Sequence, residues 1–309
     1  MMKILVTGGA GFVGSHIVDL LIEQGHQVAI IDNLSTGKEE HLNAEAVFYR
    51  MDLLDDRMPQ ILLNEKPEVV IHQAAQTQVP KSIQEPVFDA NTNIIGTIRL
   101  LEACRDAGVR KVVFASTAAV YGNPKYLPID EQHPICPLSG YGIGKYTAEQ
   151  YLYIYRQLYG LEYTVLRYAN VYGLRQDAKG EGGVIAIFID RIAQGKPIAI
   201  FGDGEQTRDY IYVKDIASAN VAAIDRGDGE VLNIGTGVST SINELVELLQ
   251  QVSGNLIIKE YKTERSGDIK DSSFNNQKAK TILDWEPKTE LLEGLRKTFY
   301  ANFKKKIVK

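Results

Sequence analysis

The chain has 309 residues, of which 44% are hydrophobic and 24% charged, so it can form one large globular domain with a smaller one attached. Its formal net charge of −5 gives no electrostatic reason to expect binding to nucleic acid or to an acidic membrane surface, and no apolar run reaches the ~18 residues that span a bilayer. The two cysteines and five histidines show no metal-ligand spacing, so we expect no metal. A chain with only two cysteines suits a reducing compartment, so we expect a cytoplasmic protein.

The first half of the chain alternates short apolar runs with stretches of helical periodicity. The predicted strands are Lys3–Thr7, Val28–Ile31, Val47–Met51, Val69–His72, Val112–Ser116 and Tyr163–Arg167, with long helices at Thr92–Ala107 and up to Tyr159. Near-continuous apolar strands joined by helices are typical of a parallel sheet that is covered on both faces. Because ligands of such sheets bind outside the carboxyl ends of the strands, functional residues should follow the strand ends.

Beyond Asn170 this alternation loosens. Val184–Gln194 and Ile242–Val252 have helical periodicity, and residues 256–273 are typical of a strand followed by a loop. We therefore predict an α/β fold with two parts. Residues 1–171, rejoined by about 210–237, would form a doubly wound parallel sheet, and residues 172–209 with 238–309 would form a smaller α/β substrate-binding lobe.

Glycines dominate the turn between the first predicted strand and the helix after it. Gly8, Gly9, Gly11 and Gly14 satisfy Gly-x-x-Gly-x-x-Gly and, from Gly9, Gly-x-Gly-x-x-Gly. Glycine allows the tight turn and lets the backbone approach a pyrophosphate, while the helix start directs N–H groups and partial positive charge at the phosphates. The pattern predicts a Rossmann-type dinucleotide site. The alternative is a glycine turn in an α/β protein that binds no nucleotide.

Two acids end the next two predicted strands. Asp32 lies about 20 residues after the glycine loop, where a carboxylate accepts hydrogen bonds from the adenosine ribose and would repel a 2′-phosphate. Because Asn33 and Leu34 follow it in place of a basic residue, we predict NAD rather than NADP. Asp52 ends the third strand and could accept from the adenine amino group, or it could be an acid of a surface turn.

Tyr141 and Lys145 form a Tyr-x-x-x-Lys pattern in the helix that runs to Tyr159. Positions four apart share a helix face, and a lysine ammonium lowers a phenol pKa that begins near ~10, so the tyrosine becomes a usable base near neutrality. A chance pair on the surface is the alternative, because the pattern is common. Here the pair lies downstream of Ser116 and Thr117 at a strand end, where a hydroxyl can bond the substrate oxygen that Tyr141 deprotonates.

A series of short motifs matches one known family in order and spacing. The motifs are Thr7–Gly14, His72–Ala75, Ala115–Gly122, Tyr141–Lys145, Arg167–Gly173, Phe201–Gly204, Arg208–Tyr210 and Arg265–Asp268. On these residues the chain resembles, over essentially its full length, the extended short-chain dehydrogenases/reductases and within them the UDP-glucose (UDP-galactose) 4-epimerases.

The resemblance implies a site for NAD. Tyr141 would be the catalytic base, Lys145 would bind the nicotinamide ribose, and Thr117 stands where these epimerases often carry serine. Gln76 or Thr77 takes the place of a family lysine, so one cofactor contact is expected to be absent. The implied cofactor residues are Gly8, Gly11, Phe12, Val13, Gly14, Asp32, Asn33, Asp52, Leu53, Ala74, Ala75, Asn93, Ser116, Tyr141, Lys145 and Tyr168.

The resemblance also implies a UDP-sugar substrate. Arg208 and Arg265 would converge on its diphosphate, since a guanidinium can bind two oxygens at once, and Phe201 would wall the uracil. Without the resemblance, Arg208 beside Asp209 would be interpreted as a surface ion pair. The implied substrate residues are Thr117, Tyr141, Asn170, Gly183, Val184, Ala199, Phe201, Arg208, Arg265, Asp268 and Ser272.

The residues after Thr117 narrow the reaction. Related sugar 4,6-dehydratases resemble Ser-Thr-Asp-Glu there, whereas Ala118 and Ala119 have no proton to transfer. The resemblance therefore implies 4-epimerisation of UDP-glucose and UDP-galactose through a 4-keto sugar, with NAD kept bound. A small Ser272, where some epimerases carry tyrosine, implies that UDP-GlcNAc and UDP-GalNAc are also accepted. The alternatives are a UDP-glucuronate epimerase, a net oxidoreductase and a non-catalytic NAD-sensing regulator.

Tyrosines cover more than one face of the helix that carries Tyr141. They are Tyr146, Tyr151, Tyr153, Tyr155 and Tyr159. Exposed aromatic residues mark interfaces, and the family usually dimerises through this helix and the one predicted at Thr92–Ala107. We therefore expect a homodimer with a four-helix contact. The alternative is that the tyrosines fold over their own domain.

Overall fold

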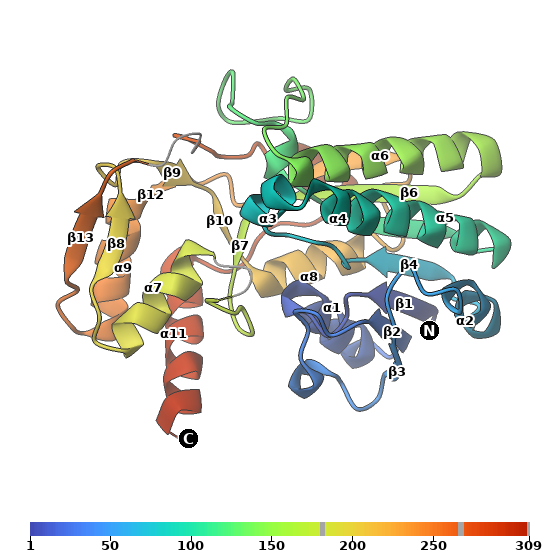
Figure 1. Ribbon diagram of the computed structural model, residues 1–309, viewed down its shortest axis with the longest axis horizontal. Coiled ribbons are helices and arrows are strands. Elements are labelled where there is room, and N and C mark those ends of the chain that lie inside the picture. The colour runs from blue at the N-terminus through green and yellow to red at the C-terminus, as the bar shows by residue number, and fades with distance from the viewer. Residues whose placement is uncertain (180–182, 265–268, 308–309) are drawn as a thin grey trace.

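The computed structural model describes residues 1–179, 183–264 and 269–307. In this part of the chain a seven-stranded parallel sheet lies at the centre, in the order β3-β2-β1-β4-β5-β6-β11 (Figure 1). Its strands are β1 Lys3–Thr7, β2 Gln27–Asp32, β3 Val47–Arg50, β4 Val69–His72, β5 Lys111–Thr117, β6 Glu162–Tyr168 and β11 Glu230–Ile234. The strand order reverses between β1 and β4, where such sheets bind dinucleotides, so the predicted doubly wound fold is confirmed.

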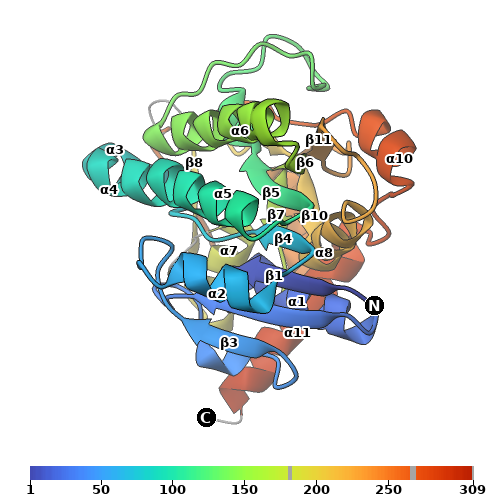
Figure 2. The same cartoon turned by 90° about the vertical axis from the view of Figure 1, so that its right-hand side faces the viewer.

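Helices cover both faces of this sheet, which explains why its strands are apolar almost without interruption. One apolar core lies between the sheet and α1 with α8, and the other lies between the sheet and α2, α5 and α6 (Figure 2). These helices are α1 Phe12–Glu23, α2 Met58–Glu65, α5 Gly96–Asp106, α6 Gly140–Tyr159 and α8 Val213–Ala222. The two helical layers leave the carboxyl ends of the strands at one edge of the sheet.

The helix predicted at Thr92–Ala107 begins earlier than its periodicity indicates. Helical structure starts with α4 at Pro86–Ala90, continues through a π-helical turn, η2, at Asn91–Ile95, and runs on into α5. Proline at a first helical turn is the signal for this start, because its missing N–H has no partner there in any case. The short segments α3 Val79–Gln84, η1 Glu39–His41 and η3 Ala118–Val120 were not predicted.

The helix α6 begins and ends where its sequence provides caps. The Ser139 hydroxyl accepts a hydrogen bond from the Gly142 N–H at 3.2 Å. At the other end Gly160 has φ of +67°, the left-handed conformation that commonly stops a helix. The predicted end at Tyr159 is therefore confirmed, and the cap at Ser139 places Tyr141 in the first turn.

Among the described residues, the second part of the chain adds three two-stranded sheets beside the central one, with the β8–β13 pair and its helices forming the lobe at the left of Figure 1. The pairs are β7 Asn170–Tyr172 with β10 Tyr210–Tyr212, β9 Thr207–Arg208 with β12 Thr240–Ser241, and β8 Ile198–Phe201 with β13 Lys259–Lys262. The helices are α7 Val184–Ala193, α9 Ile242–Ser253, α10 Gln277–Leu283 and α11 Leu291–Ile307. The helices predicted near 184 and 242 are confirmed, whereas the β7–β10 and β9–β12 pairs were not predicted.

The helices are all too short or too polar to cross a bilayer. This finding covers the residues that the structure describes.

Candidate functional site

A cleft of about 260 Å³ opens at the carboxyl ends of the central strands. The structure brings to it, of the predicted cofactor residues, Gly8, Gly11, Phe12, Val13, Gly14, Asp32, Asn33, Asp52, Leu53, Ala74, Ala75, Ser116, Tyr141, Lys145 and Tyr168, together with Thr117. A larger and more open hollow, of about 1020 Å³, lies between α1, α8 and α10 and contains none of these residues. The smaller cleft is the candidate site, because the glycine loop, the acids at the strand ends and the Tyr141–Lys145 pair converge there.

The glycine loop needs its glycines for backbone packing. Gly8 has φ of +70°, and a Cβ on it would lie 2.7 Å from the Ala74 N atom at the end of β4. A Cβ on Gly14 would lie 2.1 Å from the Gly8 carbonyl oxygen. The first turn of α1 has neither a side-chain cap nor an acid, which leaves its N–H groups and the positive end of the helix for an anion. These features fit the pyrophosphate of a dinucleotide.

Asp32 is fixed by the backbone of the loops on either side of it. One carboxylate oxygen accepts from the Ala10 N–H at 3.0 Å and the other from the Leu34 N–H at 2.8 Å. The side chain is buried, and burial raises its pKa. A Cβ on Gly37 would lie 2.9 Å from the carboxylate, so a glycine that the sequence analysis passed over is needed for the loop to pack on Asp32. The arrangement suits an adenosine ribose at the mouth of the cleft.

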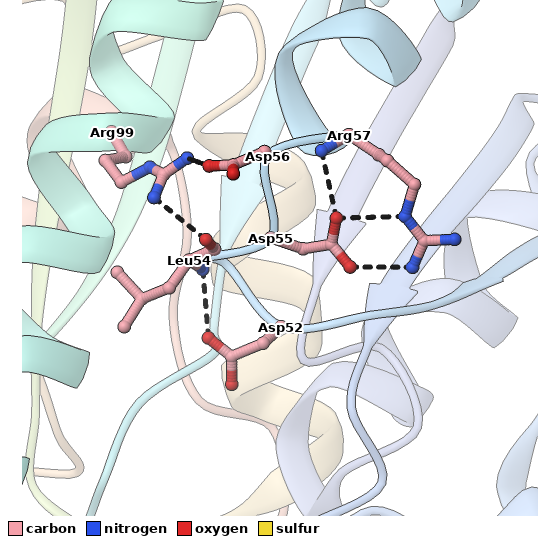
Figure 3. A network of polar contacts seen from close by, with 6 residues as sticks. All are labelled: Asp52, Leu54, Asp55, Asp56, Arg57 and Arg99. Atoms are coloured by element: carbon pink, nitrogen blue, oxygen red, sulfur yellow. Dashed lines mark hydrogen bonds and ion pairs between the residues drawn. The ribbon is translucent and has the colours of Figure 1, made fainter.

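Asp52 both lines the cleft and caps the turn after β3. Its two oxygens accept from the Asn33 amide at 2.7 Å and from the Leu54 N–H at 2.9 Å. Figure 3 shows how α5 holds the same turn: Arg99 donates to the Leu54 carbonyl at 2.8 Å and to Asp56 at 2.7 Å. The structure therefore fits both interpretations of Asp52, as an acid of a surface turn and as an acceptor for the adenine amino group, because an acid in this turn can also face an adenine.

Tyr141, Lys145 and Thr117 meet at the inner end of the cleft. Lys145 is 3% exposed, and its Nζ donates to the Ala115 carbonyl at 2.9 Å. Burial lowers the Lys145 pKa to about 8, although the carboxylates of Asp89 and Glu149 act in the opposite direction. The Thr117 hydroxyl accepts from the Ala119 N–H at 3.2 Å, which is compatible with donating its hydrogen to a substrate oxygen.

Asn93 lies behind the cleft instead of lining it. It is 2% exposed, its Oδ1 accepts from the Gln76 N–H at 2.9 Å, and its Nδ2 donates to the Gln76 carbonyl and to Asp89, each at 3.0 Å. A Cβ on Gly144 would approach the Asn93 Cβ to 3.2 Å, so this cluster is packed directly on α6. The structure therefore gives Asn93 contacts to the loop after β4, in place of the predicted direct position near cofactor and sugar.

Several cleft residues were missed by the sequence analysis. They are Ile31, Ser35, Thr36, Met51, Thr92 and Gln176, whereas Gln73, Ala115, Ala169 and Val171 stand in the quoted motifs without an assigned role and Thr77 was named at the place of an absent cofactor contact. Gln176 arrives from the loop after β7, where its Nε2 donates to the Val171 carbonyl at 3.2 Å. The next residue of that loop, Asp177, forms an ion pair with Lys38 at 2.9 Å. No sequence pattern marks Gln176, because its approach depends on a contact between distant loops.

The predicted substrate residues are spread over short elements of the second part and do not line the 260 Å³ cleft, apart from Thr117 and Tyr141. Ala199 and Phe201 share a half-buried face of β8, Gly183 and Val184 begin α7, and Asn170 is exposed in β7. Arg208 and Ser272 come together at one residue, because the Arg208 Nη1 and the Ser272 N–H donate to the Thr207 carbonyl at 2.7 and 3.2 Å. Arg265 and Asp268 lie outside the described residues.

Asp209, which lies between β9 and β10, binds the loop after β11 and the segment at Phe274 through four hydrogen bonds. Its carboxylate accepts from the Thr236 N–H at 2.8 Å and hydroxyl at 2.6 Å, from the Gly237 N–H at 2.9 Å and from the Phe274 N–H at 3.2 Å. The side chain is 1% exposed, which excludes the surface ion pair with Arg208 that the bare sequence suggests. Asp209 thus holds the segment that presents Arg208.

Comparison with known proteins agrees with this geometry. The model of a family described as "NAD dependent epimerase/dehydratase family" matches residues 4–235. The structure is similar to that of UDP-glucose 4-epimerase with UDP-glucose from Thermotoga maritima, with TM-score 0.95 and 49% identity over 100% of both chains. It is also similar to UDP-glucose 4-epimerase complexed with NAD from Thermus thermophilus, with TM-score 0.93, 40% identity and 98% of this chain and 99% of that one covered.

A third similar structure has a different sugar in its name. It is UDP-N-acetylglucosamine 4-epimerase from Methanobrevibacter ruminantium in complex with UDP-N-acetylmuramic acid. The TM-score is 0.94, the identity is 39%, and 98% of this chain and 99% of that one are covered.

Proposed function

The chain belongs to the NAD dependent epimerase/dehydratase family, and from this premise we propose that it is a UDP-hexose 4-epimerase that interconverts UDP-glucose and UDP-galactose. The observation that carries the proposal is the meeting of Tyr141, Lys145 and Thr117 in one cleft with the glycine loop. A hydroxyl donor, a phenol and a buried ammonium beside a dinucleotide site are the groups that reversible oxidation of an alcohol requires.

The described residues fit NAD along the length of the cleft. The glycine loop and the start of α1 would hold the pyrophosphate, Asp32 the adenosine ribose, and Lys145 the nicotinamide ribose. When bound there, NAD would supply the hydride acceptor and donor for C4 of the sugar. The protein supplies the orientation and the proton transfers.

Three side chains carry the proton chemistry. Thr117 donates a hydrogen bond to the C4 oxygen, and Tyr141 removes the proton of that hydroxyl. Lys145 stabilises the phenolate, since a cation beside a phenol favours its ionised form. Rotation of the 4-keto sugar presents its other face, and Tyr141 then returns the proton. Because alanines follow Thr117, the site has no acid at this position to eliminate water.

A single incubation tests the function. Purified protein is mixed with UDP-galactose without added NAD, and the nucleotide sugars are separated by chromatography. We expect a steady mixture of UDP-galactose and UDP-glucose with no growth of absorbance at the wavelength of reduced nicotinamide. A net oxidoreductase would need added NAD and accumulate its reduced form. If the protein converted UDP-glucuronate and left UDP-galactose unchanged, the result would instead favour the alternative of a UDP-glucuronate epimerase.

We further propose that the enzyme accepts UDP-GlcNAc and UDP-GalNAc. Ser272 is a small, buried residue that meets Arg208 at the Thr207 carbonyl, and a similar structure is that of a UDP-N-acetylglucosamine 4-epimerase. A small residue there leaves room for an N-acetyl group. We expect Ser272→Tyr to lose turnover of UDP-GlcNAc and to keep that of UDP-glucose. Absence of UDP-GlcNAc turnover in the unchanged protein would contradict the proposal.

We also propose a homodimer formed through α5 and α6. The helices α3 to α6 lie side by side and expose a set of apolar side chains: Ile83, Val87, Phe88, Ile95, Ile143, Ile154 and Leu158. Tyr153 and Tyr159 are also exposed, as a dimer interface requires. Tyr155 is instead buried in its own domain, as the alternative to a dimer predicted for the tyrosines. Light scattering should give twice the chain mass, and Leu158→Glu should give the single chain mass.

Residues 1–171 with about 210–237 would bind NAD, and the remaining residues would bind the nucleotide sugar. The cysteines Cys104 and Cys136 are free, as expected for the cytoplasmic location that we propose.

A further inference from the structure

A buried ion pair connects the catalytic helix to two strands of the sheet. Glu149 of α6 and Arg167 of β6 are 3% and 4% exposed, and the guanidinium reaches both carboxylate oxygens, with the Nε donating to Oε1 at 3.0 Å. The Ser116 hydroxyl of β5 donates to the same Oε1. One carboxylate of α6 therefore binds two strands at once.

We propose that Glu149 is a positioning residue for the epimerisation proposed above: by binding β5 and β6 through Ser116 and Arg167, it sets where Tyr141 and Lys145 stand relative to Thr117. It does not touch the substrate in this proposal. Its effect passes through the helix and the strand ends.

The strand register supports this role. Ser116 and Arg167 are register partners on β5 and β6, and the next pair along the strands is Thr117 with Tyr168. Ser116 itself lines the cleft, and the residues that follow Ser116 and Arg167, namely Thr117 and Tyr168, line it as well, so Glu149 binds each strand at or beside a residue of the cleft. A shift of Ser116 or Arg167 would therefore move a cleft residue directly.

The helix geometry supports it as well. Tyr141, Lys145 and Glu149 are spaced four apart on α6, so they follow one another along one face. Tyr141 lines the cleft, the Lys145 Nζ donates to the Ala115 carbonyl, and Glu149 accepts from Ser116. The helix is thus bound to two successive residues of β5, one turn apart, and without the second contact it could rotate about the first.

The network has little freedom because its members are satisfied by one another. The Arg167 Nη1 donates to the Tyr121 hydroxyl at 2.9 Å, which in turn donates to the Asn233 Oδ1 of β11 at 2.7 Å. Asn233 Nδ2 donates to the Ile129 carbonyl at 3.0 Å. A buried and mutually satisfied network of this kind rigidifies the elements that it joins.

The charge of Glu149 acts on the same group that its geometry positions. Burial lowers the pKa of Lys145, whereas Asp89 on α4 and Glu149 raise it. His72 of β4, which also interacts with Lys145, has a pKa lowered to about 3 by burial and is neutral near pH 7. Loss of Glu149 should therefore weaken the ammonium that favours the Tyr141 phenolate.

The test replaces the ion pair by apolar residues, Glu149→Leu with Arg167→Met, so that no unpaired charge is buried. We expect this variant to contain as much NAD as the unchanged protein and to have a similar KM for UDP-galactose. Its kcat should fall between about tenfold and a hundredfold, the usual consequence of a misplaced catalytic group. A kcat equal to that of the unchanged protein would overturn the proposal.

A second measurement does not depend on turnover. Ultraviolet difference titration of tyrosinate, with Tyr141→Phe as the blank, follows the ionisation of Tyr141 alone. We expect this ionisation to move to higher pH in the double variant, and an unchanged titration would overturn the proposal. If the unchanged protein proves inert on UDP-galactose, the proposed function fails while this titration still decides the role of Glu149.

Milder variants serve if the double variant does not fold. Ser116→Ala removes the contact of Glu149 to β5 and should give the same two changes at smaller size, and its NAD content is measured alongside because Ser116 also lines the cleft. Its matched control is Ser82→Ala, because Ser82 is also buried and its hydroxyl donates only to the Val79 carbonyl within α3. An effect of Ser116→Ala no larger than that of the control would overturn the proposal.

Discussion

The cofactor cleft and the second part of the chain are assembled in different ways. At the cleft, neighbouring strands of one parallel sheet end at the same edge, so residues far apart in the chain meet through topology alone. In the second part, the predicted substrate residues that the structure describes stand on short strands, at the start of α7 and in loops, and a buried side chain such as Asp209 ties the segment that presents Arg208 to neighbouring loops. A parallel sheet thus collects functional residues by its architecture, whereas the second part depends on individual polar contacts.

The largest expected effect removes chemistry from the cleft without disturbing its architecture. Tyr141→Phe deletes one hydroxyl from a half-buried residue, so folding and NAD content should be kept while kcat falls by roughly a thousandfold, within the range for general acid–base groups. Turnover of UDP-galactose, NAD content and melting temperature are measured together. Tyr153→Phe, an exposed tyrosine of the same helix, is the control. Near-normal turnover of Tyr141→Phe would exclude Tyr141 as the base.

The second largest effect is expected where a substitution disturbs the backbone packing between the glycine loop and the end of β4. Gly8 and Gly25 both have positive φ, of +70° and +80°, but a Cβ on Gly8 would meet the Ala74 backbone at 2.7 Å while a Cβ on Gly25 meets nothing within 4 Å. We expect Gly25→Ala to cost only about 1 kcal/mol of backbone strain and to keep its NAD. Gly8→Ala should be purified without NAD and melt at a lower temperature. Equal NAD content in the two variants would show that the strand-end packing is not needed for cofactor binding.

The difference between the cleft and the second part of the chain also explains how much of the fold and the site could be predicted from the sequence. The strands, the glycine loop and Asp32 follow from local patterns, because apolar runs and strand-end positions determine where a doubly wound sheet places its residues. The direction of a single side chain does not follow from such patterns. Asn93, which was expected near the cofactor and the sugar, lies in η2 and its amide bonds to Gln76 and Asp89, contacts that no local pattern indicates.

Contacts between distant loops were also beyond the sequence patterns. Gln176 enters the cleft from a loop that meets Lys38 across 139 residues, and the β9–β12 pair contains only two residues in each strand. Strands this short have no alternation to detect. The second part was therefore predicted as a region, and its internal pairing was not.

The third prediction tests whether the second part of the chain depends on Asp209. Asp209→Asn replaces one acceptor oxygen by an amide that faces N–H or O–H donors, so we expect a loss of about 2–4 kcal/mol in the free energy of unfolding. The KM for UDP-galactose should rise while NAD content is kept, because Asp209 holds the segment that presents Arg208 and none of its partners lines the cofactor cleft. Asp203→Asn is the control, since this exposed acid accepts only from the Glu205 N–H at 2.9 Å, and an amide oxygen can do the same. Loss of NAD with an unchanged KM would contradict the division between the cleft and the second part of the chain.

The smallest expected effect lies where the two regions meet. Lys38, in the loop after β2, pairs with Asp177 at 2.9 Å, and the side chains are 44% and 40% exposed. In the same loop as Asp177, Arg175 pairs with Asp19 of α1 at 2.8 Å, so the loop that carries Gln176 into the cofactor cleft is tied both to the loop after β2 and to α1. An exposed ion pair contributes at most about 1 kcal/mol, so Lys38→Ala should speed NAD release by no more than roughly fivefold.

The salt dependence of NAD release provides a second test of the Lys38–Asp177 ion pair. Because an exposed pair is screened within about 10 Å at 0.1 M salt, added KCl should speed NAD release from the unchanged protein toward the rate of Lys38→Ala and affect the variant less. Lys297→Ala is the control, because Lys297 pairs with Glu293 on α11 with similar exposure, 50% and 55%. If both variants released NAD at the unchanged rate, the loop would not retain the cofactor, and the cleft would hold NAD through the strand ends alone.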